Sequence, residues 1–157
     1  MIRLNLATDY ALRTLLYLGS RPGQQASVRE ICAFYQISSD HMSKVVQHLV
    51  HAGYLHGARG RTGGLTLAKA PEEIRLGAVL ELFEGPVALL DCVRTEDVCV
   101  IQGECRLRRV LHRAGSRLIA ELNAVTLADL VARPQPELIT LATQPGGEPL
   151  PGEEAGL

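Results

Sequence analysis

Apolar residues in the first third of the chain recur at helical spacing and predict three short helices. Thr8 is the expected N-cap of the first helix, and the Arg-Pro-Gly sequence at 21–23 is its expected end. Ser27, followed three residues later by Glu30, is a capping-box pattern that opens the second helix. Cys32 falls on the apolar face of this second helix, so we expect it to be a core residue.

The third helix follows a tight turn at 36–37 and ends before Gly53, with Ser38 or Ser39 as its N-cap. A short helix, a tight turn and a second helix with a polar outer face form the pattern of a helix-turn-helix DNA-binding unit. We expect Gln47 and His48 to read base edges, because their side chains suit groove hydrogen bonds, and shorter or charged side chains to contact phosphates. The polar residues expected to contact DNA are Ser39, His41, Ser43, Lys44, Gln47 and His48.

Two short strand patterns, at 54–56 and 64–68, come directly after the third helix. The segment that joins them is rich in glycine and carries Arg59 and Arg61. Glycines let the backbone approach a groove wall, and guanidinium groups suit phosphates and narrow minor grooves. This pattern predicts a wing that binds DNA through the two arginines, and an ordinary hairpin with a solvated tip is the alternative.

The second half of the chain predicts a helix that begins at Pro71 and a long amphipathic helix from about Cys105 to Asn123. A helix of roughly 19 residues is about 28 Å long, which is long for so small a body. Its apolar residues step by four, three and four positions, a seam typical of coiled coils. We expect this seam to pair with a second copy of the chain, with packing inside one chain as the alternative. The expected dimer interface consists of Leu107, Leu111, Ala114 and Leu118.

These elements predict a mainly α fold: a winged helix-turn-helix with a two-stranded wing and a long C-terminal dimerisation helix. We expect residues 1–70 to form the DNA-binding region and residues 71–132 to form a sensor loop with the dimerisation helix. Residues 133–157 are acidic and rich in proline and glycine, so we expect a disordered tail. Residues 1–70 carry eight Lys and Arg against three acidic residues, although the whole chain has a net charge of −1. This asymmetry predicts a local polyanion-binding face.

No apolar run approaches the roughly 18 residues that a membrane-spanning helix needs. The N-terminal segment has charged residues within its apolar pattern and lacks a cleavage site, unlike a signal peptide. We therefore expect a cytoplasmic protein with no membrane partner. Cysteines in that compartment are more often ligands or free thiols than disulfides.

Three cysteines, Cys92, Cys99 and Cys105, lie within fourteen residues directly before the long helix. Their spacing, C-x6-C-x5-C, lacks the paired CxxC of a zinc ribbon. We expect the loop to turn the three thiols toward one point. Thiolates gathered in this way favour an iron–sulfur cluster, copper(I) or zinc. Three unrelated structural cysteines are the alternative interpretation.

Several segments of the chain match a known family when taken together. They are TDYALR at 8–13, EICAFYQIS at 30–38, KVVQHL at 44–49, RGRTGGLTLA at 59–68, EEIRLGAVL at 72–80, the three cysteines and TLADLV at 126–131. With these segments the chain resembles the iron–sulfur winged-helix regulators of the IscR/NsrR family, over about residues 1–132. The resemblance is greatest to the NsrR-like, nitric-oxide-sensing repressors of that family. It implies a homodimer that binds a palindromic DNA operator and senses nitric oxide, and it implies a regulator rather than an enzyme.

The resemblance also implies a [4Fe–4S] cluster, with a [2Fe–2S] cluster as the alternative, held by Cys92, Cys99 and Cys105. IscR-type proteins add a His three residues after the third Cys, but this chain has Arg108 at that position. NsrR-type proteins can use an Asp from the first helix of the other subunit, and Asp9 matches it. The six residues between the first two cysteines depart from the five that are usual in the family.

Two other functions remain open at this point. The same cysteines would also serve a family regulator that senses iron–sulfur status, thiol redox state or zinc. The chain would alternatively be an iron–sulfur electron carrier that does not bind DNA, for which a wing is not needed.

Overall fold

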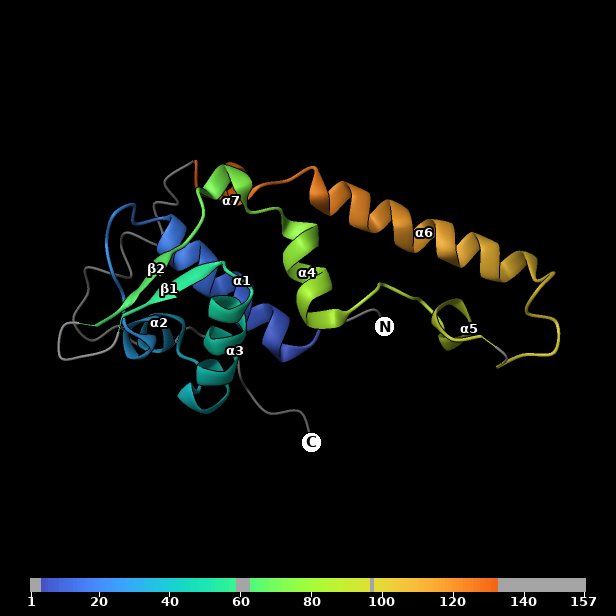
Figure 1. The fold of residues 1–157 in the computed structure, drawn as a ribbon, viewed down its shortest axis with the longest axis horizontal. Coiled ribbons are helices and arrows are strands. Elements are labelled where there is room, and N and C mark those ends of the chain that lie inside the picture. Colours follow the sequence, from blue (N-terminus) through green and yellow to red (C-terminus); the bar gives the residue numbers. More distant parts are fainter. Residues whose placement is uncertain (1–3, 59–62, 97, 133–157) are drawn as a thin grey trace, which may run out of the picture.

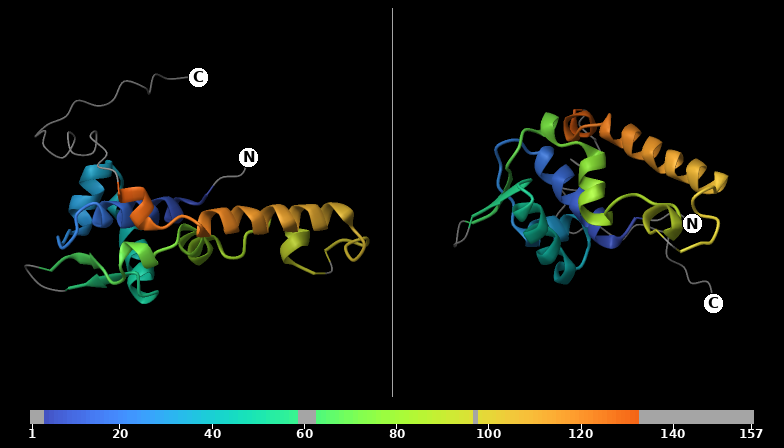
Figure 2. Two further views of the ribbon diagram at one scale, coloured as in Figure 1. Left: turned by 90° about the horizontal axis from the view of Figure 1, so that it is seen from above. Right: turned by 45° about the vertical axis from the view of Figure 1, so that its right-hand side comes forward.

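The computed structural model describes residues 4–58, 63–96 and 98–132 and is mainly helical (Figure 1). Most elements form one helical body, and α6 projects from it as an arm with α5 beside its far end (Figures 1 and 2). This arrangement confirms the predicted mainly α fold with a two-stranded wing and a long helix near the C-terminus. The elements are α1 (Leu6–Gly19), α2 (Val28–Tyr35), α3 (Ser39–His51), β1 (Leu55–Gly57), β2 (Leu65–Leu67), the 3-10 turn η1 (Pro71–Glu73), α4 (Leu76–Glu84), α5 (Asp91–Arg94), α6 (Arg106–Asn123) and α7 (Leu127–Val131).

The helix-turn-helix is built as the sequence predicts. Ser27 and Glu30 form the capping box at the start of α2, with each side chain bound to the other residue's backbone N–H. Gln36 adopts the left-handed conformation, with φ of 53°, and so turns the chain between α2 and α3. Ser38 is the N-cap of α3, and Gly53 follows it with φ of 73°. The turn and the caps together determine how α3 follows α2.

The core of the body lies between α1, α2 and α3. Leu15, Ile31, Met42 and Leu49 are almost completely buried there. Burying each of these side chains stabilises the fold by about 1.5–3 kcal/mol relative to exposure. The apolar face of α3 is thus used for packing, and its polar face is left for solvent or a partner.

The start of α1 differs from the prediction. Its N-cap is Asn5, whose side-chain oxygen accepts the backbone N–H of Thr8 at 2.8 Å. Thr8 itself lies inside the first turn, where it is buried and its hydroxyl donates to Glu84 of α4. The prediction of Thr8 as N-cap was wrong because Asn and Thr are both capping residues, and the local pattern does not distinguish them.

The wing is an antiparallel pair in which Leu55 lies opposite Leu67 and Gly57 opposite Leu65. Ala26 forms a further bridge with Leu65, which ties the wing to the loop before α2. Both strands place a leucine in or against the core. Arg59 and Arg61, the predicted DNA contacts of the wing, lie outside the described residues.

The helix that was predicted to begin at Pro71 begins later. Pro71 opens the single turn η1, Ile74 is extended, and α4 starts only at Leu76. The carbonyl of Ile74 accepts the N–H of Leu127 at 2.8 Å, and the N–H of Leu76 donates to the carbonyl of Val125 at 3.0 Å. This pairing with a segment far along the chain holds Ile74 and Arg75 out of the helical conformation.

The arm α6 has 18 residues and is therefore about 27 Å long. It packs on α4, and Gly115 lies against the segment after α4. A Cβ atom at Gly115 would lie 3.0 Å from the carbonyl oxygen of Val87, so a larger residue would force the backbone there to move by a few tenths of an ångström. α7, capped by Thr126, returns the chain to α1. None of the helices in the described parts is long and apolar enough to cross a membrane.

Candidate functional site

The exposed face of α3 carries the residues predicted to contact DNA. At 3.6 residues per turn, Lys44 and Gln47 lie at the centre of that face, opposite the buried stripe. The ring of His48 packs edge-on against Phe83 of α4, with the ring centroids 4.8 Å apart. α4 therefore orients this histidine at the border of the face. The residues that are exposed on α3 as predicted are Ser39, His41, Ser43, Lys44, Gln47 and His48.

Asp40 is a residue of this face that the sequence analysis did not consider. It is exposed in the first turn of α3, between the predicted phosphate contacts. Its backbone N–H is held by the side chain of Ser38 at 3.3 Å, and its charge suits the positive end of the helix dipole. The acidic residue lowers the positive charge of this face.

Asp9, the predicted fourth ligand, lies on α1 and is held by an ion pair. Nε of Arg13 donates to both carboxylate oxygens, at 2.9 and 3.0 Å. The Arg13 guanidinium in turn lies 5.5 Å from the centroid of the Tyr35 ring. The sequence analysis missed Arg13, although its spacing of four residues from Asp9 on a helix is the signal of such a pair.

The cysteine triad, defined as Cys92, Cys99 and Cys105, occupies three different local structures. Cys92 lies in the short helix α5 and is half-buried. Cys99 is exposed in the turn after it, where its carbonyl accepts the N–H of Gln102 at 3.1 Å. Cys105 is the N-cap of α6, and its Sγ accepts the backbone N–H of Arg108 at 3.4 Å. All three are free thiols.

The single chain does not gather the triad into a metal site. No three side chains of His, Cys, Asp or Glu lie together as possible metal ligands among residues 4–58, 63–96 and 98–132. The expected meeting of the three thiols at one point is therefore not seen in one chain. The donor chemistry nevertheless fits an iron–sulfur cluster, because three free thiols, which are the ligands such clusters prefer, lie on one segment.

Two polar side chains that the sequence analysis did not single out as functional bind the backbone of this segment. Gln102 is buried and forms hydrogen bonds at three backbone groups between Cys92 and Val98. Arg108, at the position where IscR-type proteins have histidine, donates to the carbonyl of Cys92 at 2.8 Å. No local sequence signal distinguishes these side chains from solvated ones.

Cys32 is a core residue, as predicted. It is only 6% exposed on α2, and burial raises the pKa of its thiol. Its Sγ is 4.0 Å from the carbonyl oxygen of Ser38, at the limit of a weak hydrogen bond. A neutral, buried thiol so placed serves packing and not ligation.

The predicted dimer seam lies along the arm. Leu107 is 58% exposed and Leu118 is 39% exposed, and Ala114 is also exposed, whereas Leu111 is half-buried. Val110, half exposed beside them, enlarges the apolar strip. Exposed apolar residues gathered on one projecting helix are typical of an interaction surface.

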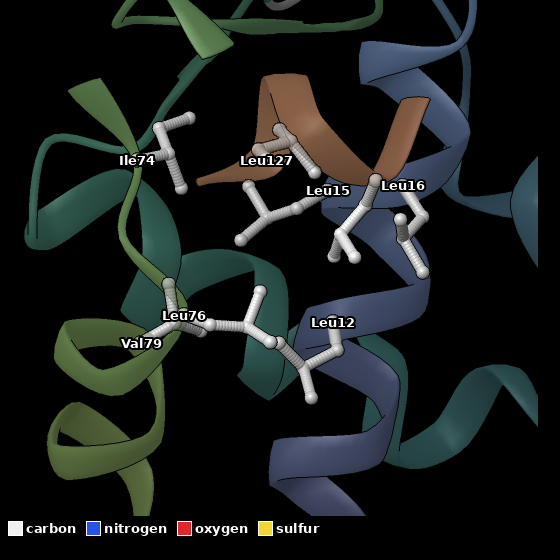
Figure 3. Close-up of a pocket in the computed structure, with 8 residues that line it drawn as sticks. Leu12, Leu15, Leu16, Ile74, Leu76, Val79 and Leu127 are labelled. Carbon is white, nitrogen blue, oxygen red and sulfur yellow. The ribbon is translucent and has the colours of Figure 1, made fainter. Parts of the chain in front are cut away.

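A further apolar space lies where α1, α4 and α7 meet (Figure 3). The side chains of Leu12 and Leu76 face one another across it, with Leu127 at the side of α7. Its volume is about 230 Å³. Its lining is wholly aliphatic: Leu12, Leu15, Leu16, Ile74, Leu76, Val79, Leu127 and Leu130.

Comparisons with known proteins agree with this architecture. CymR, the global cysteine regulator of B. subtilis, has a similar fold, with a TM-score of 0.68 at 22% identity, over 84% of this chain and 98% of CymR. IscR of T. potens has the same TM-score of 0.68 at 20% identity, over 93% of this chain and 94% of IscR. At these identities the two structures show that the fold is shared.

The sequence comparisons are more specific. The HTH-type transcriptional regulator NsrR of Halalkalibacterium halodurans is 40% identical over 132 residues, which are 83% of this chain and 90% of that protein. The family model Rrf2, described as iron-dependent transcriptional regulator, matches residues 4–133. The chain therefore belongs to the Rrf2 family of transcriptional regulators.

Proposed function

We propose that this regulator is a homodimeric repressor that binds a palindromic DNA operator and releases it in response to nitric oxide. The observation that carries the proposal is the set of three free cysteines at the far end of an exposed helical arm, in a chain 40% identical to an NsrR. In this proposal residues 1–70 bind DNA and residues 71–132 sense the signal and dimerise.

Cys92, Cys99 and Cys105 would supply three thiolates to a [4Fe–4S] cluster, and Asp9 of the partner subunit would supply a carboxylate. This ligand set would give one iron a harder, more weakly bound ligand than a thiolate, and so a site for a small ligand such as nitric oxide. Asp9 must leave or share its ion pair with Arg13 to take this role, because Arg13 holds both carboxylate oxygens. Because the ion pair is exposed to solvent, breaking it costs little free energy.

The two halves of the chain are linked through α1. Asp9 and the core residue Leu15 belong to the same helix, and that helix packs on α3. A partner's cysteine segment that binds Asp9 would therefore fix the position of α3 relative to the other subunit. Because a dimer reads half-sites at a fixed spacing, a small change in that position weakens DNA binding.

DNA contact is assigned to the exposed face of α3 and to the wing. Lys44 with the two serines would bind phosphates, Gln47 and His48 would read base edges, and Arg59 and Arg61 would bind beside them. Dimerisation is assigned to the strip of Leu107, Leu111, Ala114 and Leu118. The exposure of this strip supports pairing, because a second copy would cover it.

A second candidate is a regulator of the same family that senses thiol redox state, iron–sulfur status or zinc. The exposure of Cys99 favours its thiol redox version, because an exposed thiol is accessible to oxidants. The polar face of α3 and membership of a transcriptional regulator family argue against an electron carrier that does not bind DNA.

Anaerobic purification followed by iron and sulfide analysis and a visible absorption spectrum tests the proposal. We expect iron and sulfide in equal amounts and the broad visible absorption of an iron–sulfur cluster, which nitric oxide should change. A colourless protein that binds zinc, or one whose thiols alone respond to oxidants, would favour the second candidate.

A further inference from the structure

Gln102 is a buried polar residue in an otherwise exposed segment. It is 8% exposed, while its neighbours Ile101 and Gly103 are exposed. Its Nε2 donates to the carbonyls of Cys92 at 3.0 Å and Thr95 at 2.6 Å. Its Oε1 accepts the backbone N–H of Val98 at 3.1 Å. One side chain thus joins three separate points of the backbone.

These three points span the interval between the first two cysteines of the triad. Residues 93–98 form that interval, which is one residue longer than is usual for the family that this chain resembles. The bonds of Gln102 reach the residue before the interval, a residue within it and its last residue. The backbone N–H of Gln102 adds a bond to the carbonyl of Cys99 at 3.1 Å. The Gln102 side chain therefore connects the two ends of the longer loop, at Cys92 and Val98.

Arg108 provides a second donor to the same carbonyl. Its Nε lies 2.8 Å from the carbonyl oxygen of Cys92, so this oxygen accepts from both Arg108 and Gln102. The backbone N–H of Arg108 also donates to Sγ of Cys105 at 3.4 Å. Arg108, 16 residues after Cys92, therefore contacts both the first and the third cysteine of the triad.

We propose that Gln102 and Arg108 form a clasp that positions the cysteine triad before any metal binds. The clasp ties Cys92 and the Cys99 turn to the start of α6 through these hydrogen bonds. Arg108 then has a positioning role at the place where other members of the family have a histidine ligand. The role of the clasp toward a cluster rests on the proposed function, whereas its effect on the loop does not.

The test uses the full-length protein without metal, in which the reactivity of each thiol reports on the conformation of the cysteine loop. Gln102→Met keeps the length of the side chain, and Arg108→Met keeps only an unbranched apolar stem. Both remove the side-chain hydrogen bonds. The exposed Glu104→Gln in the same segment is the matched control. Alkylation by iodoacetamide, followed by peptide mass spectrometry, gives the rate at Cys92 relative to that at Cys99. Buried Cys32 reports global unfolding in the same sample.

We expect Cys92, which is half-buried, to react more slowly than exposed Cys99 in the wild type. Gln102→Met loses three side-chain hydrogen bonds and Arg108→Met loses one charged one. Either loss should raise the relative rate at Cys92 about tenfold or more, with Cys32 still protected. An unchanged ratio in both variants would overturn the clasp. Alkylation of Cys32 in both would also overturn it, because the two side chains would then support the whole fold. If only Gln102→Met unfolds, the alkylation ratio of Arg108→Met decides whether the clasp exists.

A second measurement concerns the cluster. In anaerobically reconstituted protein, both variants should lose their visible absorption to a chelator about tenfold faster than the wild type and Glu104→Gln. If the alkylation ratio changes and the cluster lifetime does not, the clasp orders the loop but does not stabilise the bound cluster. If the wild type takes up no cluster, the proposed function fails, and the alkylation ratio still decides whether the clasp orders the loop.

Discussion

Asp9 and Arg13 should have opposite effects on the proposed cluster. The Arg13 guanidinium holds both oxygens of the carboxylate that is offered to the partner subunit. Asp9→Ala therefore removes the proposed ligand, whereas Arg13→Ala keeps the ligand and removes its competitor. Asp9→Asn is the matched control, because it keeps the size of the side chain and removes its charge.

The fold should tolerate both changes. The Asp9 and Arg13 side chains are 42% and 39% exposed, and an exposed pair four residues apart on a helix contributes about 0.3–0.5 kcal/mol. Asp9 also favours the first turn of α1 by about 0.3–1 kcal/mol. Asp9→Ala should therefore lower the free energy of unfolding by at most about 1.5 kcal/mol. Chemical denaturation of the metal-free protein measures this value.

Cluster lifetime separates the two variants. The assay follows the loss of visible absorption from anaerobic protein in the presence of a chelator. We expect Asp9→Ala and Asp9→Asn to lose the cluster faster than the wild type and to bind DNA more weakly, and Arg13→Ala to retain it at least as long. Equal lifetimes in wild type and Asp9→Ala would refute the reasoning. His112, seven residues after Cys105, would then be the next ligand to test.

Four further predictions concern the other parts of the molecule. Arg59→Ala and Arg61→Ala should each weaken operator binding and reduce the slope of affinity against salt by about one, since each loses a phosphate or groove contact; unchanged slopes would exclude the wing. Leu111→Glu should give monomers or unfolded chain in sedimentation, because pairing would bury an unpaired carboxylate, and a folded dimer would contradict the seam. Alanine at any one residue of the cysteine triad should sharply lower iron content, whereas Cys32→Ser should leave it near normal. Met42→Ala should lower the free energy of unfolding by about 2–5 kcal/mol in denaturant titration, because Met42 is completely buried between α1 and α3.

Sequence reasoning succeeded where local chemistry decides local structure. The capping box of Ser27 and Glu30 and the buried stripe of α3 follow from residue type and spacing. The tight turn after α2 was also predicted, although not that Gln36 makes it in the left-handed conformation. It failed where a distant segment decides. Pro71 suits a helix start, but Ile74 is held extended by Leu127, and no local pattern contains that pairing.

The candidate site was predictable only as a set of residues. The spacing of the cysteine triad and the polar face of α3 are visible in the sequence, so these residues could be named. The hydrogen bonds of Gln102 and Arg108 could not, because they join residues up to 16 positions apart through backbone groups that carry no sequence signal. The ion pair of Asp9 with Arg13 follows helical spacing and was available to the same reasoning.

The most direct test of nitric oxide sensing is DNA affinity measured before and after nitric oxide on one anaerobic sample. The probe is a fluorescent duplex selected from a random pool by the cluster-loaded wild type, and fluorescence anisotropy gives the affinity. The account predicts tight binding that nitric oxide abolishes in the wild type, and weak binding that it does not change in Cys99→Ser. Affinity that is the same with and without nitric oxide, in protein that carries the cluster, would contradict it.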